Sequence, residues 1–131
     1  MIAAGIGCRA GCSAEQLLEL LLRALAAQGR SLDDVQALVA PDFKGSEPGL
    51  VQAAEQLHKP LLALPLEQLQ RQAADTLSHS QRIVEQFGVP CLAEAAALAG
   101  AASFLPGVHA RLLGPRLASE SATCALAEWL P

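Results

Sequence analysis

Residues 5–13, with the sequence GIGCRAGCS, constrain the fold of this chain more than any other segment. They follow a short apolar run, residues 2–4, and precede a leucine-rich segment, residues 17–25. This order predicts a buried strand, a glycine-rich turn and an amphipathic helix. Ser13 and Gln16 have the spacing of a capping box, which places the beginning of the helix at this point.

The beginning of this helix is also a candidate anion site. Backbone amides at a helix N-terminus point outward and are made mildly positive by the helix dipole, and Arg9 adds a full charge beside them. The predicted contacts are Gly7, Cys8, Arg9, Gly11 and Ser13. The spacing matches neither GxGxxG nor the Walker pattern, so a tight turn whose glycines serve only backbone geometry is an equal alternative.

The rest of the chain alternates between short apolar runs and helical patterns. Further strands are predicted at 35–39, 61–64, 110–113 and 123–126, and helices at 50–57, 66–77, 80–87 and 91–99, the last ending at Gly100. This alternation predicts an α/β fold, a layered sandwich with a mostly parallel sheet flanked by helices. The last two strands could pair as an antiparallel edge. We expect a single domain over residues 1–131.

Composition excludes several classes of function. The formal net charge is −4 and tyrosine is absent, so neither charge attraction nor ring stacking favours a nucleic-acid partner. No apolar run approaches the roughly 20 residues that span a bilayer, and the N-terminus shows no signal-peptide pattern. Four cysteines in a chain of 131 residues do not suggest a disulfide scaffold. We therefore expect a cytoplasmic protein that binds neither nucleic acid nor membranes.

A second candidate loop, residues 41–47, follows the predicted strand at 35–39. Ligands bind outside the carboxyl ends of parallel strands, so this loop and the first are expected at one edge of the sheet. Lys44 could pair with a carboxylate, and Glu47 could accept a hydrogen bond or act as a general base. Taken alone, the pair fits a solvated ion pair at a helix start better, and the first loop is what argues for function.

No metal or cofactor is predicted from the cysteines and histidines. Cys8 and Cys12 lack the further ligands of a structural zinc site, and the histidines are scattered. Cys91 and Cys124 lie in apolar surroundings and are expected to be small core residues.

Four later polar residues allow more than one interpretation. Glu94, near the start of an alanine-rich helix, is expected chiefly to interact with the helix dipole. Thr123 could donate a hydrogen bond into a pocket or simply fill a strand end. Arg111 and Arg116 flank a Gly-Pro turn and could meet an acidic ligand or be surface charges.

Taken in order, these motifs resemble the CobE/CbiG C-terminal family of cobalamin biosynthesis. The matching motifs are Gly5-Ile6-Gly7-Cys8-Arg9 with Ser13, Lys44-x-x-Glu47-x-Gly49-Leu50, Gly88-Val89 with Glu94-Ala95-Ala96, and Thr123 through Ala127. The resemblance covers nearly the whole chain and is closer to the stand-alone CobE form than to the longer CbiG form. It implies functional roles for Gly7, Cys8, Arg9, Ser13, Lys44, Glu47, Gly49, Glu94 and Thr123.

The resemblance also implies a pathway and a ligand. CbiG members open a lactone on a cobalt-containing corrin precursor and release acetaldehyde, whereas CobE-like members belong to the oxygen-dependent route without a comparably clear reaction. Corrin precursors are flat and rich in carboxylates, which Arg9, Lys44 and backbone amides would complement. We therefore expect a protein that binds a tetrapyrrole intermediate, as a carrier or as an accessory to the pathway enzymes. Two alternatives stay open: a lactone-opening hydrolase in which Glu47 positions water, and a non-catalytic interaction module in a biosynthetic complex.

Overall fold

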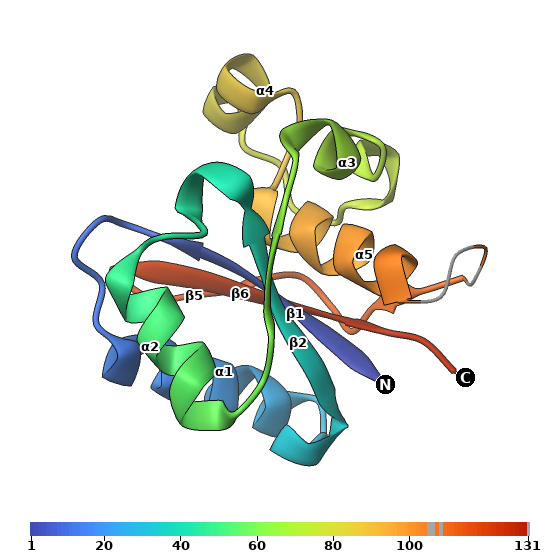
Figure 1. Cartoon of the computed structure of the whole chain (residues 1–131). Helices are drawn as coiled ribbons and strands as arrows, with labels where there is room; N and C mark the ends of the chain where they lie inside the picture. The colour runs from blue at the N-terminus through green and yellow to red at the C-terminus, as the bar shows by residue number, and fades with distance from the viewer. Residues whose placement is uncertain (105–106, 108, 131) are drawn as a thin grey trace.

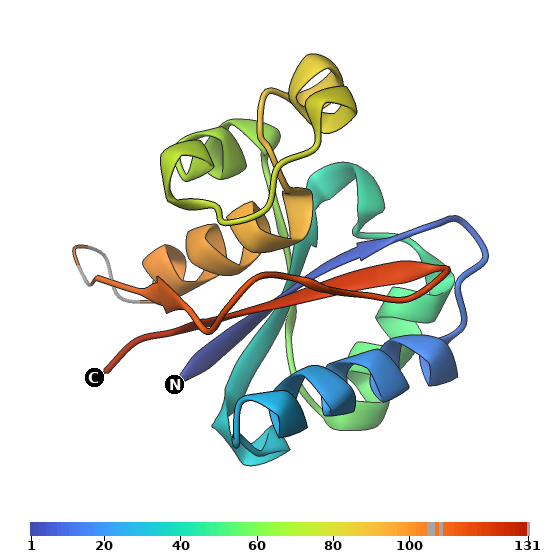
Figure 2. The same cartoon turned by 180° about the vertical axis from the view of Figure 1, so that it is seen from behind.

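The computed structural model describes residues 1–104, 107 and 109–130, and shows helices on both faces of one six-stranded sheet (Figures 1 and 2). The strands lie in the order β3 (Leu61–Leu64), β2 (Val35–Pro41), β1 (Ile2–Cys8), β6 (Ala122–Glu128) and β4 (Arg111–Leu112), and β5 (Leu117–Ala118) also pairs with β6. β1, β2 and β3 are parallel, whereas β6 is antiparallel to β1, β4 and β5. The predicted layered α/β fold, with its parallel strands and antiparallel edge, is confirmed.

The two faces of β1 belong to two separate parts of the core. Ile2, Ala4 and Ile6 pack with α1 (Ala14–Ala27) and α2 (Pro48–Leu57), which lie together on one face of the sheet (Figure 1). Ala3 packs on the opposite side with α5 (Leu92–Phe104). Side chains alternate between the faces of a strand, so a strand covered on both faces must be apolar throughout. This explains the uninterrupted apolar run at the N-terminus.

Helix α5 extends beyond its predicted end at Gly100, and that prediction is wrong. The helix continues to Phe104, so Gly100 lies inside it. The position requires glycine because a Cβ there would collide with the side chain of Val39 in β2. Most of the helix is buried, in keeping with its alanine-rich sequence. In the described part of the chain no single helix is long and apolar enough to cross a membrane. Only α4 (Gln81–Phe87) and α5 together, bent by 55° at their junction, meet that test.

The helix predicted over 66–77 is shorter than its apolar pattern indicates. Helix α3 ends at Gln70 (Leu66–Gln70), and a short 3₁₀ turn, η3 (Ala73–Asp75), follows. At the far end of the predicted segment, the amides of Leu77 and Ser78 donate to the Glu94 carboxylate instead of to helical carbonyls, so this end is not helical. The separate helix predicted over 80–87 is present as α4, and Figure 2 shows α3 and α4 together above α5.

Two further 3₁₀ turns flank β2. One, η1 (Leu32–Asp34), leads into the strand, and the other, η2 (Asp42–Lys44), follows it and leads toward α2. Phe43 of η2 stacks on Phe87 at the end of α4, with ring centroids 5.2 Å apart and planes 9° from parallel. This stack fixes the end of α4 beside the carboxyl end of β2.

Candidate functional site

The carboxyl end of β1 meets the beginning of β6 at one edge of the sheet. Gly7 is paired with Thr123, and Cys8 with Ala122. A Cβ at Gly7 would lie 2.6 Å from Thr123 Oγ1, so the glycine leaves this hydroxyl uncovered. The Arg9 amide donates to the carbonyl of Ser121 at 2.9 Å, which ties the first loop to β6. The structure thus brings together four predicted residues, Gly7, Cys8, Arg9 and Thr123.

A two-part groove runs along this edge, and we call it the arginine groove. One part, of about 230 Å³, is lined by Cys8, Arg9 and Ser121 together with Gly7, Arg82 and Thr123. The other part, of about 220 Å³, is lined by Ser80, Cys91 and Arg116 together with the same Gly7, Arg82 and Thr123. Because these three residues line both parts, the two parts lie side by side.

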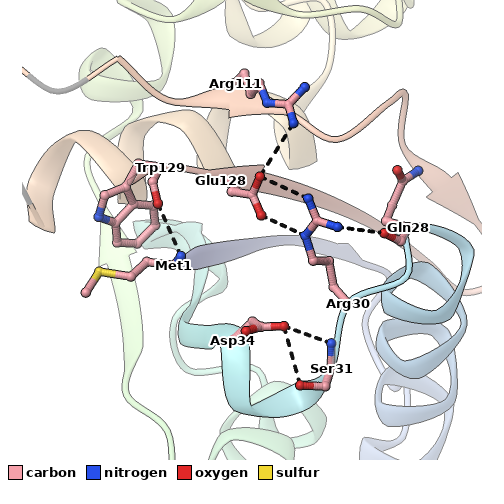
Figure 3. Close-up of polar contacts among 8 residues, drawn as sticks. All are labelled: Met1, Gln28, Arg30, Ser31, Asp34, Arg111, Glu128 and Trp129. Carbon is pink, nitrogen blue, oxygen red and sulfur yellow. Dashed lines mark hydrogen bonds and ion pairs between the residues drawn. The ribbon is translucent and has the colours of Figure 1, made fainter. Parts of the chain in front are cut away.

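Three arginines from different segments give the groove its positive charge. Arg9 comes from the β1–α1 loop, Arg82 from α4 and Arg116 from the β4–β5 turn, while Glu120 is an acid at one end. Sequence reasoning missed Arg82, because nothing local to α4 indicates that this helix folds over the edge of the sheet. Arg111, by contrast, lies elsewhere, 3.6 Å from Glu128 at the far end of β6 (Figure 3).

The backbone amides of the first loop do not form an open anion cradle. Gly11 donates its amide to Glu47 Oε1 at 2.9 Å, Cys12 donates to the carbonyl of Arg9 at 3.1 Å, and Ser13 donates to Gln16 Oε1 at 3.1 Å. The backbone amide of Gln16 in turn donates to the Ser13 hydroxyl, which confirms the predicted capping box. The expectation of outward-facing amides is therefore wrong at Gly11 and Cys12, and the Arg9 side chain is the cationic group that this loop offers.

The second predicted loop packs against the first, but beside the arginine groove. Gly49 is buried against the first loop, where a Cβ would collide with the Cys12 carbonyl, so the position requires glycine. Glu47 accepts a hydrogen bond from the Gly11 amide. Burial raises the pKa of the Cys8 thiol, the nearby charge of Lys44 lowers it, and Cys12 and Glu47 raise it. Lys44 and Glu47 thus lie near Cys8, as predicted, yet neither lines the two parts of the groove.

Glu94 forms a buried clamp next to the groove. Its side chain is fully buried, Oε1 accepts the amides of Leu77 at 2.7 Å and Ser78 at 2.8 Å, and Oε2 accepts the Ser78 hydroxyl at 2.7 Å and the Arg116 amide at 2.8 Å. Burial alone raises the pKa of this carboxyl, but the hydrogen bonds from Ser78, Arg116 and Leu77 outweigh it and hold the pKa below its ordinary value. The interpretation of Glu94 chiefly as a partner of the helix dipole is therefore incomplete, since it fastens two loops to α5.

The cysteine and histidine side chains add no further constellation. Within the described residues, no three His, Cys, Asp or Glu side chains lie close enough to hold a metal ion. Cys91 and Cys124 are buried, and burial raises the pKa of Cys124 to about 12. Their prediction as core residues is confirmed.

Comparisons with known proteins agree on one family. The sequence model of the family described as "Cobalamin synthesis G C-terminus" matches residues 2–127. The relative named Protein CobE, from a Sinorhizobium species, is 31% identical over 123 residues, which cover 94% of this chain and 77% of the relative.

Solved structures extend the likeness to three dimensions. A crystal structure of CobE, described as a protein from the cobalamin (vitamin B12) biosynthetic pathway, matches with a TM-score of 0.91 and 44% identity over 100% of this chain and 91% of that chain. The cobalamin biosynthesis protein chiG from Agrobacterium tumefaciens str. C58 matches with a TM-score of 0.73 and 36% identity over 97% of each chain. The chain therefore belongs to the cobalamin synthesis G C-terminal family, which its sequence motifs resemble.

Proposed function

We propose that this cobalamin biosynthesis protein binds a carboxylate-rich tetrapyrrole intermediate in the arginine groove, as a carrier or as an accessory to the pathway enzymes. The family and the relatives named for cobalamin biosynthesis support the pathway. One observation carries the binding role: Arg9, Arg82 and Arg116, from three separate segments, line the two adjacent parts of the groove, with Arg82 common to both.

The chemistry of the groove suits many carboxylates on one flat molecule. A guanidinium group can pair with a carboxylate through two parallel hydrogen bonds, and its planar fork retains this geometry in a solvated site. Thr123 and Ser121 add hydroxyl donors along the same wall, and Gly7 leaves the backbone open to close approach. The carboxylates at the edge of a tetrapyrrole would therefore meet hydrogen-bond donors along the groove.

The size of the groove favours a carrier over an enclosing active site. Neither part alone, at about 220 to 230 Å³, reaches the roughly 300–1,000 Å³ of pockets that enclose a drug-sized ligand. A tetrapyrrole would lie with one edge in the groove and the other accessible to a second protein. Phe43 already stacks on Phe87, so recognition would depend on charge more than on ring stacking.

The hydrolase alternative receives less support from the arrangement of Glu47. Its Oε1 accepts the Gly11 amide, and the residue lies beside the groove. A general base needs an oxygen within reach of the attacking water in the substrate site.

A titration with a corrin polycarboxylate tests the proposal. We expect cobyrinic acid to bind saturably, as read from its visible absorbance, and its peripherally amidated counterpart to bind at least tenfold more weakly. Arg82→Gln should weaken cobyrinic acid binding about tenfold, whereas Arg71→Gln, at the exposed end of α3, should leave it unchanged.

Three outcomes would reject the carrier proposal. Equal binding of the acid and its amide would show that the arginines do not select the ligand. Turnover of a lactone-bearing corrin that is lost in Glu47→Gln would indicate the hydrolase. Absence of binding to any corrin would leave the interaction module.

A further inference from the structure

A second cavity lies at the other end of β1. It measures about 350 Å³ and is bounded by the η3–Leu77 segment, by α5 and by β4. Arg111 of β4 pairs with Glu128, which is opposite Ile2, the first residue of β1, whereas the arginine groove begins at Gly7. At about 3.3 Å per residue, five residues of strand separate the two sites by roughly 16 Å. They share no lining residue.

One part of the cavity wall is apolar and held in place by the fold, and the other part is polar. Leu98 of α5 is only 4% exposed, and Leu112 is held by its pairing with Ala127 of β6. Leu77 is 59% exposed, although its amide is fixed by the hydrogen bond to Glu94. A large apolar side chain that is held beside the apolar part of a preformed cavity offers a binding surface to the apolar body of a ligand.

The rim of the cavity carries a cation that the fold uses little. Arg30 donates to both carboxylate oxygens of Glu128, at 2.7 and 3.1 Å, while Arg111 approaches one of them at 3.6 Å (Figure 3). The hydrogen bond from Arg30 holds the pKa of Glu128 below its ordinary value. Because Arg30 already matches this charge and the Arg111 side chain is 73% exposed, the Arg111 guanidinium can accept an anion at the rim.

We propose that this cavity binds a small molecule with an apolar body and a single anionic head group, of the class of medium-chain carboxylates. The apolar body lies against Leu77, Leu98 and Leu112, and the head group pairs with Arg111. His109 and Gln72 line the same rim and can donate further hydrogen bonds. Arg111 is the one arginine among its described lining residues, and Asp75 also lines the cavity, so a ligand with a single anionic group fits this cavity better than a polycarboxylate does. The cavity shares no described lining residue with the arginine groove, and the site does not depend on the proposed tetrapyrrole function.

Titrations of amide chemical shifts with octanoate and with 1-octanol test this site. We expect octanoate to shift the amides of Leu98, Ala102 and Leu112 saturably, while those of Gly7 and Thr123 stay unchanged. Arg111→Gln should weaken octanoate about tenfold and leave the weaker binding of octanol unaltered, because only the acid uses the guanidinium. Arg23→Gln, an exposed arginine of α1, is the matched control and should bind octanoate like the wild type.

A variant that fills the cavity separates a site from a surface charge. Ala102→Leu places a larger side chain on the cavity wall and should weaken both probes, with an unchanged urea midpoint as the check on folding. The proposal is overturned if octanoate shifts Gly7 and Thr123 instead, if Arg111→Gln binds octanoate as tightly as Arg23→Gln, or if neither probe saturates.

Discussion

The Glu94 clamp and the arginine groove meet at the β4–β5 turn, yet their charges are satisfied in opposite ways. Glu94 is fully buried and accepts four hydrogen bonds from the protein. Arg9 and Arg82 are exposed, and no hydrogen bond or ion pair joins either guanidinium to the rest of the described chain. A buried charge must be matched by the fold, whereas an exposed charge need not be. A charged group whose hydrogen bonds are all made within the protein therefore stabilises the fold, whereas one without such partners is available to a ligand.

The two regions are nevertheless linked through Arg116. Its amide donates to Glu94 Oε2, and the same residue lines the arginine groove. The clamp thus fixes the backbone of one groove residue, as expected of rigid support beneath a binding site. Substitutions in the clamp should therefore lower the stability of the fold, and they should weaken ligand binding only as a consequence of that loss of stability.

The largest expected effect is the loss of stability in Glu94→Gln. The amide that replaces one carboxylate oxygen presents donors to the donors of Ser78 or Arg116, and the charge that strengthens the other hydrogen bonds is lost. We expect the free energy of unfolding to fall by about 2–4 kcal/mol in urea denaturation. Glu85→Gln, on the exposed side of α4, should change it by less than about 0.5 kcal/mol. A change below about 1 kcal/mol in Glu94→Gln would contradict the clamp.

The clamp should also make stability depend on acid pH. Because the pKa of Glu94 is lower in the folded protein than the unfolded value of about 4.3, its contribution is present above that value and lost as the pH falls through the folded pKa. Urea denaturation from pH 7 to pH 3 should show the wild type losing its advantage over Glu94→Gln as the pH falls below about 4.3. Parallel curves for the two proteins would show that the carboxylate is not selectively stabilised. The lowered pKa of Glu128 affects both proteins alike and cancels in the difference.

A smaller effect on stability is expected at Glu47, whose burial and hydrogen bonding are intermediate between those of Glu94 and those of the exposed arginines. It is half-buried and accepts one backbone hydrogen bond, from Gly11. Glu47→Ala should lower the free energy of unfolding by about 1 kcal/mol, measured in urea, and Glu55→Ala on the exposed face of α2 serves as the control. If stability is unchanged while turnover of a lactone-bearing corrin is lost, the Glu47 carboxylate serves function and not the fold.

The smallest effect on stability is expected in the groove itself. Arg9→Gln should change the free energy of unfolding by less than about 0.5 kcal/mol, because the guanidinium is exposed and the backbone hydrogen bond to Ser121 is retained. Thermal unfolding at matched protein concentration measures this. A loss above about 1 kcal/mol would mean that Arg9 serves the fold, and the contrast with Glu94 would fail.

Local patterns predicted the parts of this molecule that local chemistry determines. The capping box at Ser13, the apolar strands and the α4 helix follow from short-range spacing and burial. The helix predicted over 66–77 ends at Gln70, and the far end of the predicted segment is held by Glu94, which is distant in sequence and accepts the amides of Leu77 and Ser78. Likewise Gly100 resembles a helix stop until Val39 of a distant strand is seen against it.

The candidate site shows the same division. Gly7, Cys8, Arg9 and Thr123 were predicted and do meet, because strand pairing of β1 with β6 brings the ends of these motifs together. Arg82 was missed because it reaches the edge of the sheet only through the docking of α4. The amides of Gly11 and Cys12 were predicted to be open, but their partners Glu47 and the Arg9 carbonyl emerge only from the folded loop.

The central claim, that the arginine groove binds carboxylates with charges the fold does not need, is tested by two measurements on one double variant. Arg9→Gln combined with Arg82→Gln should raise the dissociation constant for cobyrinic acid at least 30-fold, and its urea midpoint should stay at the wild-type value. An unchanged dissociation constant, or a loss of binding that is matched by a loss of stability, would contradict the account.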